Sequence, residues 1–100
     1  MQRMKFFIDT HDRRSATFPA GLGKEQFADF FGKYEAVARE HGVVVLRVHV
    51  GLEEGRAYCF TMAPGVDQVR AVHQALGLPY EVITEVATAT PGDLFFRPAM

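Results

Sequence analysis

The order of extended and helical segments constrains the fold of this 100-residue chain more than any other feature. Short runs rich in β-branched and aromatic residues alternate with two longer segments in which apolar residues recur every three or four positions. The predicted strands cover residues 4–9, 43–50, 56–63 and 78–90, and the predicted helices cover 24–42 and 63–77. The chain therefore has the order strand, helix, strand, strand, helix, strand.

Glycine and proline support these boundaries. Gly42 and Gly77 stand where the two helical patterns end, and Pro64 stands where the second one begins. The polar sequence "GLEEG" at 51–55 separates two strand-like runs by a compact turn, which predicts a hairpin. Residues 10–23 are polar and interrupted by Pro19 and Gly21, so we expect a long loop there.

This order of elements is that of the ferredoxin-like βαββαβ fold, of the α+β class. In it, two helices cover one face of a four-stranded antiparallel sheet. One hundred residues suit a single domain, 1–100, with a core at about 4–90 and an irregular C-terminal tail at 91–100. Because the other face of the sheet stays uncovered, we expect the functional residues or a second copy of the chain to lie there.

Composition excludes several classes of function. The residues are 48% hydrophobic and 23% charged with a net charge of -1, as in a globular protein without a basic surface for nucleic acid. No stretch approaches the roughly 20 apolar residues of a membrane span, and "MQRMKFFID" lacks an apolar run typical of a signal peptide. We therefore expect a cytoplasmic protein with neither nucleic-acid nor membrane partners.

Side-chain alternation divides the strand residues between two faces. We expect Phe6 and Ile8 to point into the core, which turns Phe7, Asp9 and His11 outward. On the hairpin, the predicted core residues are Leu46, Val48, Val50, Tyr58, Phe60 and Met62. The predicted outward residues are Arg47, His49, Ala57, Cys59 and Thr61. A bulge in the hairpin would reverse one strand and take Cys59 into the core.

The outward set contains candidate metal ligands. Imidazole and thiolate suit nickel, zinc and copper, and His11, His49 and Asp9 can supply three ligands from neighbouring strands. The alternative is that these are ordinary polar residues of an exposed sheet face. The single cysteine, Cys59, excludes an internal disulfide and a CxxC zinc motif, and its alternative role is that of a small buried hydrophobe. His73 shares a helix face with apolar residues, so it also fits a boundary histidine packed against the sheet edge.

The stretch from residue 58 to 79 combines four short motifs. They are Tyr58-Cys59 on a strand, Ala63-Pro64 before the second helix, His73 within it, and Gly77-Leu78-Pro79 before the last strand. This combination resembles a family of small bacterial ferredoxin-like proteins, formerly of unknown function and now described as nickel-binding. The resemblance implies a homodimer built on the sheet, nickel bound by histidine and oxygen ligands, and no catalytic activity. Cys59 and His73 match hallmark positions of that family.

Together these observations predict a small dimeric metal-binding protein without catalytic activity, with nickel as the metal and zinc or copper as alternatives. The predicted metal-site residues are His11, His49, Cys59, His73 and Asp9. The alternative function is a small enzyme or small-molecule-binding module with a pocket at the open sheet face or dimer interface, where His49 or His73 acts as acid or base. A purely structural dimer is the third alternative.

Overall fold

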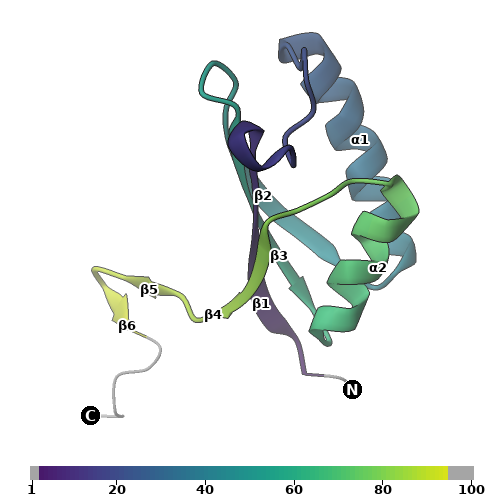
Figure 1. Ribbon diagram of the computed structural model, residues 1–100. Coiled ribbons are helices and arrows are strands. Elements are labelled where there is room, and N and C mark those ends of the chain that lie inside the picture. The colour runs from purple at the N-terminus through teal and green to yellow at the C-terminus, as the bar shows by residue number, and fades with distance from the viewer. Residues whose placement is uncertain (1–2, 95–100) are drawn as a thin grey trace.

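The computed structural model describes residues 3–94 and has the predicted α+β architecture (Figure 1). Four antiparallel strands form one sheet in the order β2-β3-β1-β4, which is the ferredoxin-like order. The main elements are β1 (Lys5–Asp12), α1 (Lys24–Glu40), β2 (Val44–Gly51), β3 (Arg56–Ala63), α2 (Val66–Leu76) and β4 (Val82–Val86). A single 3-10 turn, η1 (Arg13–Ser15), follows β1.

Both helices lie on the same side of the sheet (Figure 1). Helix α1 begins after Gly23, whose N–H donates a hydrogen bond of 3.1 Å to the side chain of Gln26. Helix α2 ends at Gly77, which adopts the left-handed conformation (φ 63°) that favours glycine at a helix C-terminus. Neither of these helices, the two that the structure describes, has the length and apolar character needed to cross a membrane.

The side of the sheet that faces the helices carries residues that were predicted to point outward. Phe7, Asp9 and His11 of β1 are buried there, opposite Thr61, Cys59 and Ala57 of β3. The predicted orientation of both strands is therefore wrong. The helices supply large side chains to this core, among them Tyr34 and Val72, so the space that remains over β3 accommodates only small side chains.

The opposite side, which we call the open face, carries the large apolar residues of the same strands. Phe6 and Phe60 stack there with ring centroids 5.9 Å apart. Tyr58 is exposed, as are Val44 and Val82 on the two edge strands. Because the two sides of the sheet both carry apolar residues, alternation alone did not reveal which side the helices cover.

A bulge in β2 explains why this strand was only partly predicted. The register between β2 and β3 shifts between Val45 and Arg47, so Leu46 has no partner on β3. Leu46 was predicted to lie in the core but is exposed. Val48 packs against the core, as predicted. Beyond the bulge Arg47 and His49 pair with Phe60 and Tyr58 and are exposed on the open face, as predicted.

The C-terminal part of the chain leaves the sheet after β4, which is shorter than the predicted strand at 78–90. Two short strands, β5 (Ala89–Thr90) and β6 (Asp93–Leu94), pair with each other away from the main sheet (Figure 1). The predicted irregular tail, 91–100, starts within this hairpin, and residues 95–100 lie outside the described residues. The division into core and tail stays a prediction.

Gly55, in the turn between β2 and β3, provides a test of this fold. It has φ 71°, and a Cβ at this position would lie 2.6 Å from Nε and 2.9 Å from Cβ of Arg13. Gly42 has φ 77°, but a Cβ added there would meet no atom within 4 Å, so it is a matched control. We expect Gly42→Ala to cost about 1–2 kcal/mol from strain alone and Gly55→Ala to cost about 1 kcal/mol or more beyond that, because of the clash. Urea unfolding measures both; equal losses would contradict the packing of Arg13 over this turn.

Candidate metal centre

Three polar residues meet beneath the helices. Asp9 and His11 are two residues apart on β1, so their side chains project from the same side of the strand. His73 reaches them from α2, where it lies on the buried side with Val69 and Val72. The exposed fractions are 0% for Asp9, 4% for His11 and 2% for His73. We call these three residues the Asp9 cluster.

A single carboxylate oxygen contacts both histidines of the cluster. Oδ1 of Asp9 lies 2.8 Å from Nε2 of His11 and 3.1 Å from Nε2 of His73. The two imidazole rings are stacked, with centroids 5.4 Å apart. One ligand atom from each of the three residues lies within 4.8 Å of the other two, which is compatible with a shared metal ion.

The other nitrogen of each ring faces the backbone. Nδ1 of His11 donates to the carbonyl oxygens of Pro79 (2.8 Å) and Thr17 (3.1 Å). Nδ1 of His73 donates to the carbonyl oxygen of Val69 (2.9 Å). A carbonyl oxygen only accepts hydrogen bonds, so in both rings the proton belongs on Nδ1.

In this tautomer, neither Nε2 atom can donate a hydrogen bond to Asp9. In a neutral ring with the proton on Nδ1, Nε2 carries a lone pair, and here both lone pairs point at the carboxylate of Asp9. The contacts are favourable only if each ring carries a second proton or if a cation lies among the three groups. Backbone carbonyls that hold Nδ1–H and direct Nε2 inward are the usual support of histidine metal ligands.

More unsatisfied polar atoms lie in the core. Among the described residues, four buried side-chain oxygens have no hydrogen-bond partner, and three of them belong to the core: Oδ2 of Asp9, Oη of Tyr34 and Oγ1 of Thr61. Cys59 is the direct cross-strand partner of Asp9, and its side chain is buried. Buried polar groups in proteins are normally paired, and the thiol of Cys59, which interacts with the carboxylate of Asp9, meets this need only in part.

The negative charge of Asp9 and the positive charge of a protonated His73 stabilise each other. Burial by itself raises the pKa of Asp9, but hydrogen bonds from His11 and His73 outweigh burial and lower this pKa below its ordinary value. Burial alone lowers the pKa of His73, but the hydrogen bond and the negative charge of Asp9 outweigh burial and raise it. The metal-free cluster therefore favours an ionised carboxylate and a protonated His73.

Cys59 and Tyr34 stay protonated beside this carboxylate. Burial is the main cause that raises the pKa of both groups, and the negative charge of Asp9 raises each further. A thiol with a raised pKa is a poor nucleophile. Cys59 is thus unsuited to covalent catalysis, but a bound metal ion can displace the proton of a thiol.

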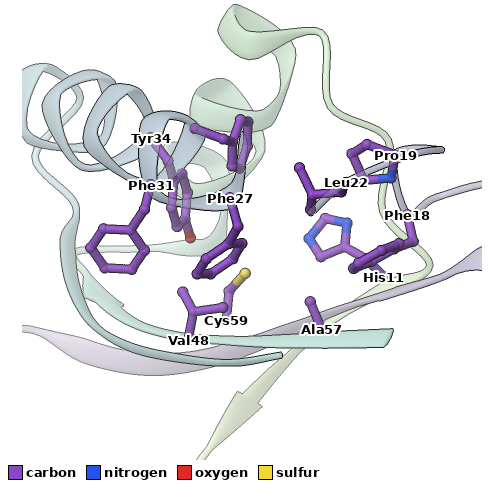
Figure 2. Close-up of a pocket in the computed structure, with 11 residues that line it drawn as sticks. His11, Phe18, Pro19, Leu22, Phe27, Phe31, Tyr34, Val48, Ala57 and Cys59 are labelled. Atoms are coloured by element: carbon purple, nitrogen blue, oxygen red, sulfur yellow. The ribbon is translucent and has the colours of Figure 1, made fainter. Parts of the chain in front are cut away.

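A small cavity lies beside the cluster, between α1, the loop after η1 and the sheet (Figure 2). Its volume is about 30 Å³. Figure 2 shows the ring of His11 on one side and the sulfur of Cys59 below the hydroxyl of Tyr34. Apolar side chains complete the lining: Phe18, Pro19, Leu22, Phe27, Phe30, Phe31, Val48 and Ala57. The space holds about one water molecule.

The structure separates the predicted site residues into two groups. It brings Asp9, His11 and His73 together, with Cys59 next to Asp9, all on the side that the helices cover. His49 lies exposed on the open face and takes no part in this cluster. The predicted outward position of Asp9, His11 and Cys59 was wrong, because the strands present the opposite side to the helices.

Several residues that shape the centre were not predicted from the sequence. Thr17 and Pro79 contribute backbone carbonyls, which any residue can supply, so their side chains carry no signal. Tyr34 is one of the buried residues of α1, and nothing in the sequence indicates that its hydroxyl faces the centre. The rings of Tyr80 and His73 pack edge to face, with centroids 5.0 Å apart. The position of Tyr80 directly after the Gly-Leu-Pro motif is the one hint in the sequence.

Comparison with known families gives a clear result. The model of the family described as "Nickel responsive protein SCO4226-like" matches residues 7–86. The chain belongs to this family. The match begins within β1 and ends with β4, so it contains the whole Asp9 cluster. The resemblance expected from the motifs around Cys59 and His73 is confirmed.

Two solved structures share the fold. The crystal structure of SCO4226 from Streptomyces coelicolor A3(2) aligns with 85% of this chain and 99% of its own, with a TM-score of 0.71 and 22% identity. A structural genomics structure of protein YJCS aligns with 87% of this chain and 100% of its own, with a TM-score of 0.57 and 10% identity. No curated protein matches the sequence. At these identities the two structures support the fold alone.

The coupled charges of this SCO4226-like chain predict how metal-free stability depends on pH. The lowered pKa of Asp9 stabilises the fold above the ordinary carboxyl pKa of about 3.9, and this contribution is lost as pH falls through the folded value. The raised pKa of His73 stabilises the fold below the ordinary value of about 6.5, and this contribution is lost as pH rises through the folded value. Stability in chelator should therefore be greatest between about pH 4 and 6.5. Asp9→Asn should flatten the decline above pH 6.5 in thermal melts; parallel curves for the two proteins would contradict the pairing.

Proposed function

We propose that this protein is a small metal-binding protein that holds nickel at the Asp9 cluster and has no catalytic activity. The observation that carries the proposal is the convergence of the Nε2 atoms of two histidines on a buried carboxylate, with both Nδ1 atoms held by backbone carbonyls. A divalent cation at this point would take the two Nε2 atoms and the carboxylate as ligands and displace the proton of His73. The description of the family as nickel responsive supports nickel as that cation.

The ligands proposed are Asp9, His11 and His73. Cys59 lies outside this group of atoms within 4.8 Å and is proposed as a fourth donor that approaches when the metal binds. Imidazole and carboxylate bind several divalent metals, and imidazole with thiolate also suits zinc and copper, which remain the alternatives. Cys59 qualifies because it is buried, stands opposite Asp9 in the sheet, and interacts electrostatically with that carboxylate. Binding releases the protons held by His73 and Cys59, so affinity should increase with pH.

The surroundings of the cluster support binding and not turnover of an organic substrate. The adjoining cavity, at about 30 Å³, accepts no molecule larger than a few atoms. The alternative of a small-molecule module has one observation in its favour, a groove of about 500 Å³ on the open face that includes Arg47 and His49. An organic ligand retained through purification and lost in His49→Ala would favour that alternative.

A homodimer built on the open face is part of the proposal. Four large hydrophobic residues are exposed in the described part of the sheet and its bulge: Val44, Leu46, Tyr58 and Val82. The family resemblance implies a dimer on the sheet, and a second copy of the same apolar face is the partner that fits it. The cytoplasmic location and the lack of nucleic-acid and membrane partners stay predictions from composition.

Metal titration tests the site. Wild-type protein should bind one Ni²⁺ per chain in calorimetry, and Asp9→Asn or His73→Gln should weaken binding by at least about 100-fold, because losing even an outer partner of a ligand costs about 10–100-fold. The Asn amide can donate hydrogens to the Nε2 atoms, so Asp9→Asn should preserve the fold, which circular dichroism checks.

His49→Ala is the matched control for this titration. It also removes an imidazole, but from the open face, so its nickel affinity should equal that of wild type. Equal weakening by His49→Ala and His73→Gln would show that nickel binds imidazoles without a specific site. Co²⁺ gives a further check, since loss of a thiolate charge-transfer band in Cys59→Ser would identify the sulfur as a ligand.

A separate prediction concerns self-association. Tyr58→Lys places a charge on the open face and should weaken dimerisation by about tenfold or more, as expected when an aromatic contact is lost at an interface. Ala36→Lys, on the exposed surface of α1, is the control and should leave association unchanged. Sedimentation over a range of concentrations measures both. A monomeric wild type, or equal effects of the two substitutions, would rule out this dimer.

A further inference from the structure

A groove on the protein surface reaches the buried cluster beside α2. It has a volume of about 510 Å³ and is bounded by the end of α2 and by the segment that leads into β4. The residues that line it are Arg70, His73, Gln74, Gly77, Leu78, Pro79 and Tyr80. His73 is thus both a member of the Asp9 cluster and part of the groove wall, although only 2% of it is exposed.

The segment 77–81 covers the cluster at this point and touches both histidines. The carbonyl oxygen of Pro79 accepts the hydrogen bond from Nδ1 of His11 at 2.8 Å. The ring of Tyr80 meets the ring of His73 edge to face, at 5.0 Å and 65°. This short segment therefore controls how closely the cluster is shut off from the groove.

Backbone N–H groups at the two ends of this segment donate hydrogen bonds to the rest of the fold. At the start, the N–H groups of Gly77 and Leu78 donate to the last turn of α2, and at the end the N–H of Glu81 donates to Thr10 at 2.8 Å. Between them, Pro79 has no N–H to donate. If the centre moves outward, Nδ1 of His11 loses the Pro79 oxygen but keeps the oxygen of Thr17 at 3.1 Å. Movement thus breaks one hydrogen bond and one ring contact while His11 stays oriented.

We propose that this segment is the access route for the metal ion and that the ring of Tyr80 closes it over His73. The inference rests on the proposed function, since it concerns the same site. Tyr80 is here a positioning residue: it touches His73 and contributes no ligand. Its removal should change how fast a divalent cation enters and leaves, and should change the equilibrium affinity little.

The cavity of Figure 2 is the other path to the cluster, through the side of His11. It is small and walled mainly by Phe, Leu, Val and Ala side chains, so a hydrated cation would lose its water there without compensation. The groove is wider and offers the amide oxygen of Gln74 to a hydrated cation. The positive charge of Arg70, paired with Asp67 at 3.2 Å, stands at this mouth and should slow an approaching cation at low salt.

Stopped-flow measurements on the whole chain test the route, with Co²⁺ as the probe for uptake and a chelator to drive release. Tyr80→Ala should accelerate both uptake and release by about tenfold, within the range over which related complexes vary in rate, with a change in Kd below about threefold. Tyr80→Phe keeps the ring and should match wild type. Leu22→Ala, which opens the apolar cavity, should leave both rates unchanged. Arg70→Ala should speed uptake at low salt only.

The outcomes separate this inference from the function on which it rests. If Leu22→Ala accelerates exchange and Tyr80→Ala does not, the cation uses the cavity and the proposed route is wrong. If Tyr80→Ala weakens equilibrium binding while the rate of uptake stays the same, Tyr80 supports the ligands and does not close a path. If wild-type protein fails to bind Co²⁺ or Ni²⁺, the proposed function itself fails, and the route fails with it.

Discussion

The carboxylate of Asp9, fully buried between two imidazoles, is the interaction on which the organisation of this protein depends. An isolated buried charge is very costly, and it is retained only where partners compensate for the lost water. Here the partners come from four parts of the chain: His11 from the same strand, His73 from α2, and the carbonyls of Thr17 and Pro79, from two different loops, that orient the ring of His11. The core of the fold and the candidate metal centre are therefore one structure.

The two sides of the sheet differ in the residues that they carry. The covered side holds the polar cluster, surrounded by small residues of β3 and large residues of the helices. The open face is more apolar than a solvent-exposed sheet normally is, with the stacked pair Phe6 and Phe60 and the exposed ring of Tyr58. The proposed metal site and the proposed dimer interface therefore lie on opposite sides of the sheet.

The sequence pointed to the residues of the candidate site but placed most of them on the wrong side of the sheet. Asp9 and His11 were predicted as potential ligands from their chemistry, and Cys59 and His73 also from the resemblance to the family. The i, i+2 spacing correctly placed Asp9 and His11 on one side of a strand. Their side of the sheet was wrong because large apolar residues were assumed to face the helices. His49 has the same chemistry as His73 but lies on the open face, and in the sequence only the family motifs around His73 distinguished the two.

What the sequence by itself determined is the order of the elements, their approximate ends and the family. The periodicity of apolar residues and the helix-stopping glycines reflect local backbone preferences, so they can be read from short stretches of sequence. The motifs around Cys59 and His73 are likewise short stretches, and they indicate the family. Tertiary structure alone decided which side of each strand is buried, where the bulge at Leu46 shifts the register, and which nitrogen of His11 and His73 faces Asp9. Alternation shows which residues of a strand share a side, but it does not show which of the two sides the helices cover. That depends on how side chains from the helices and the sheet fill a common volume.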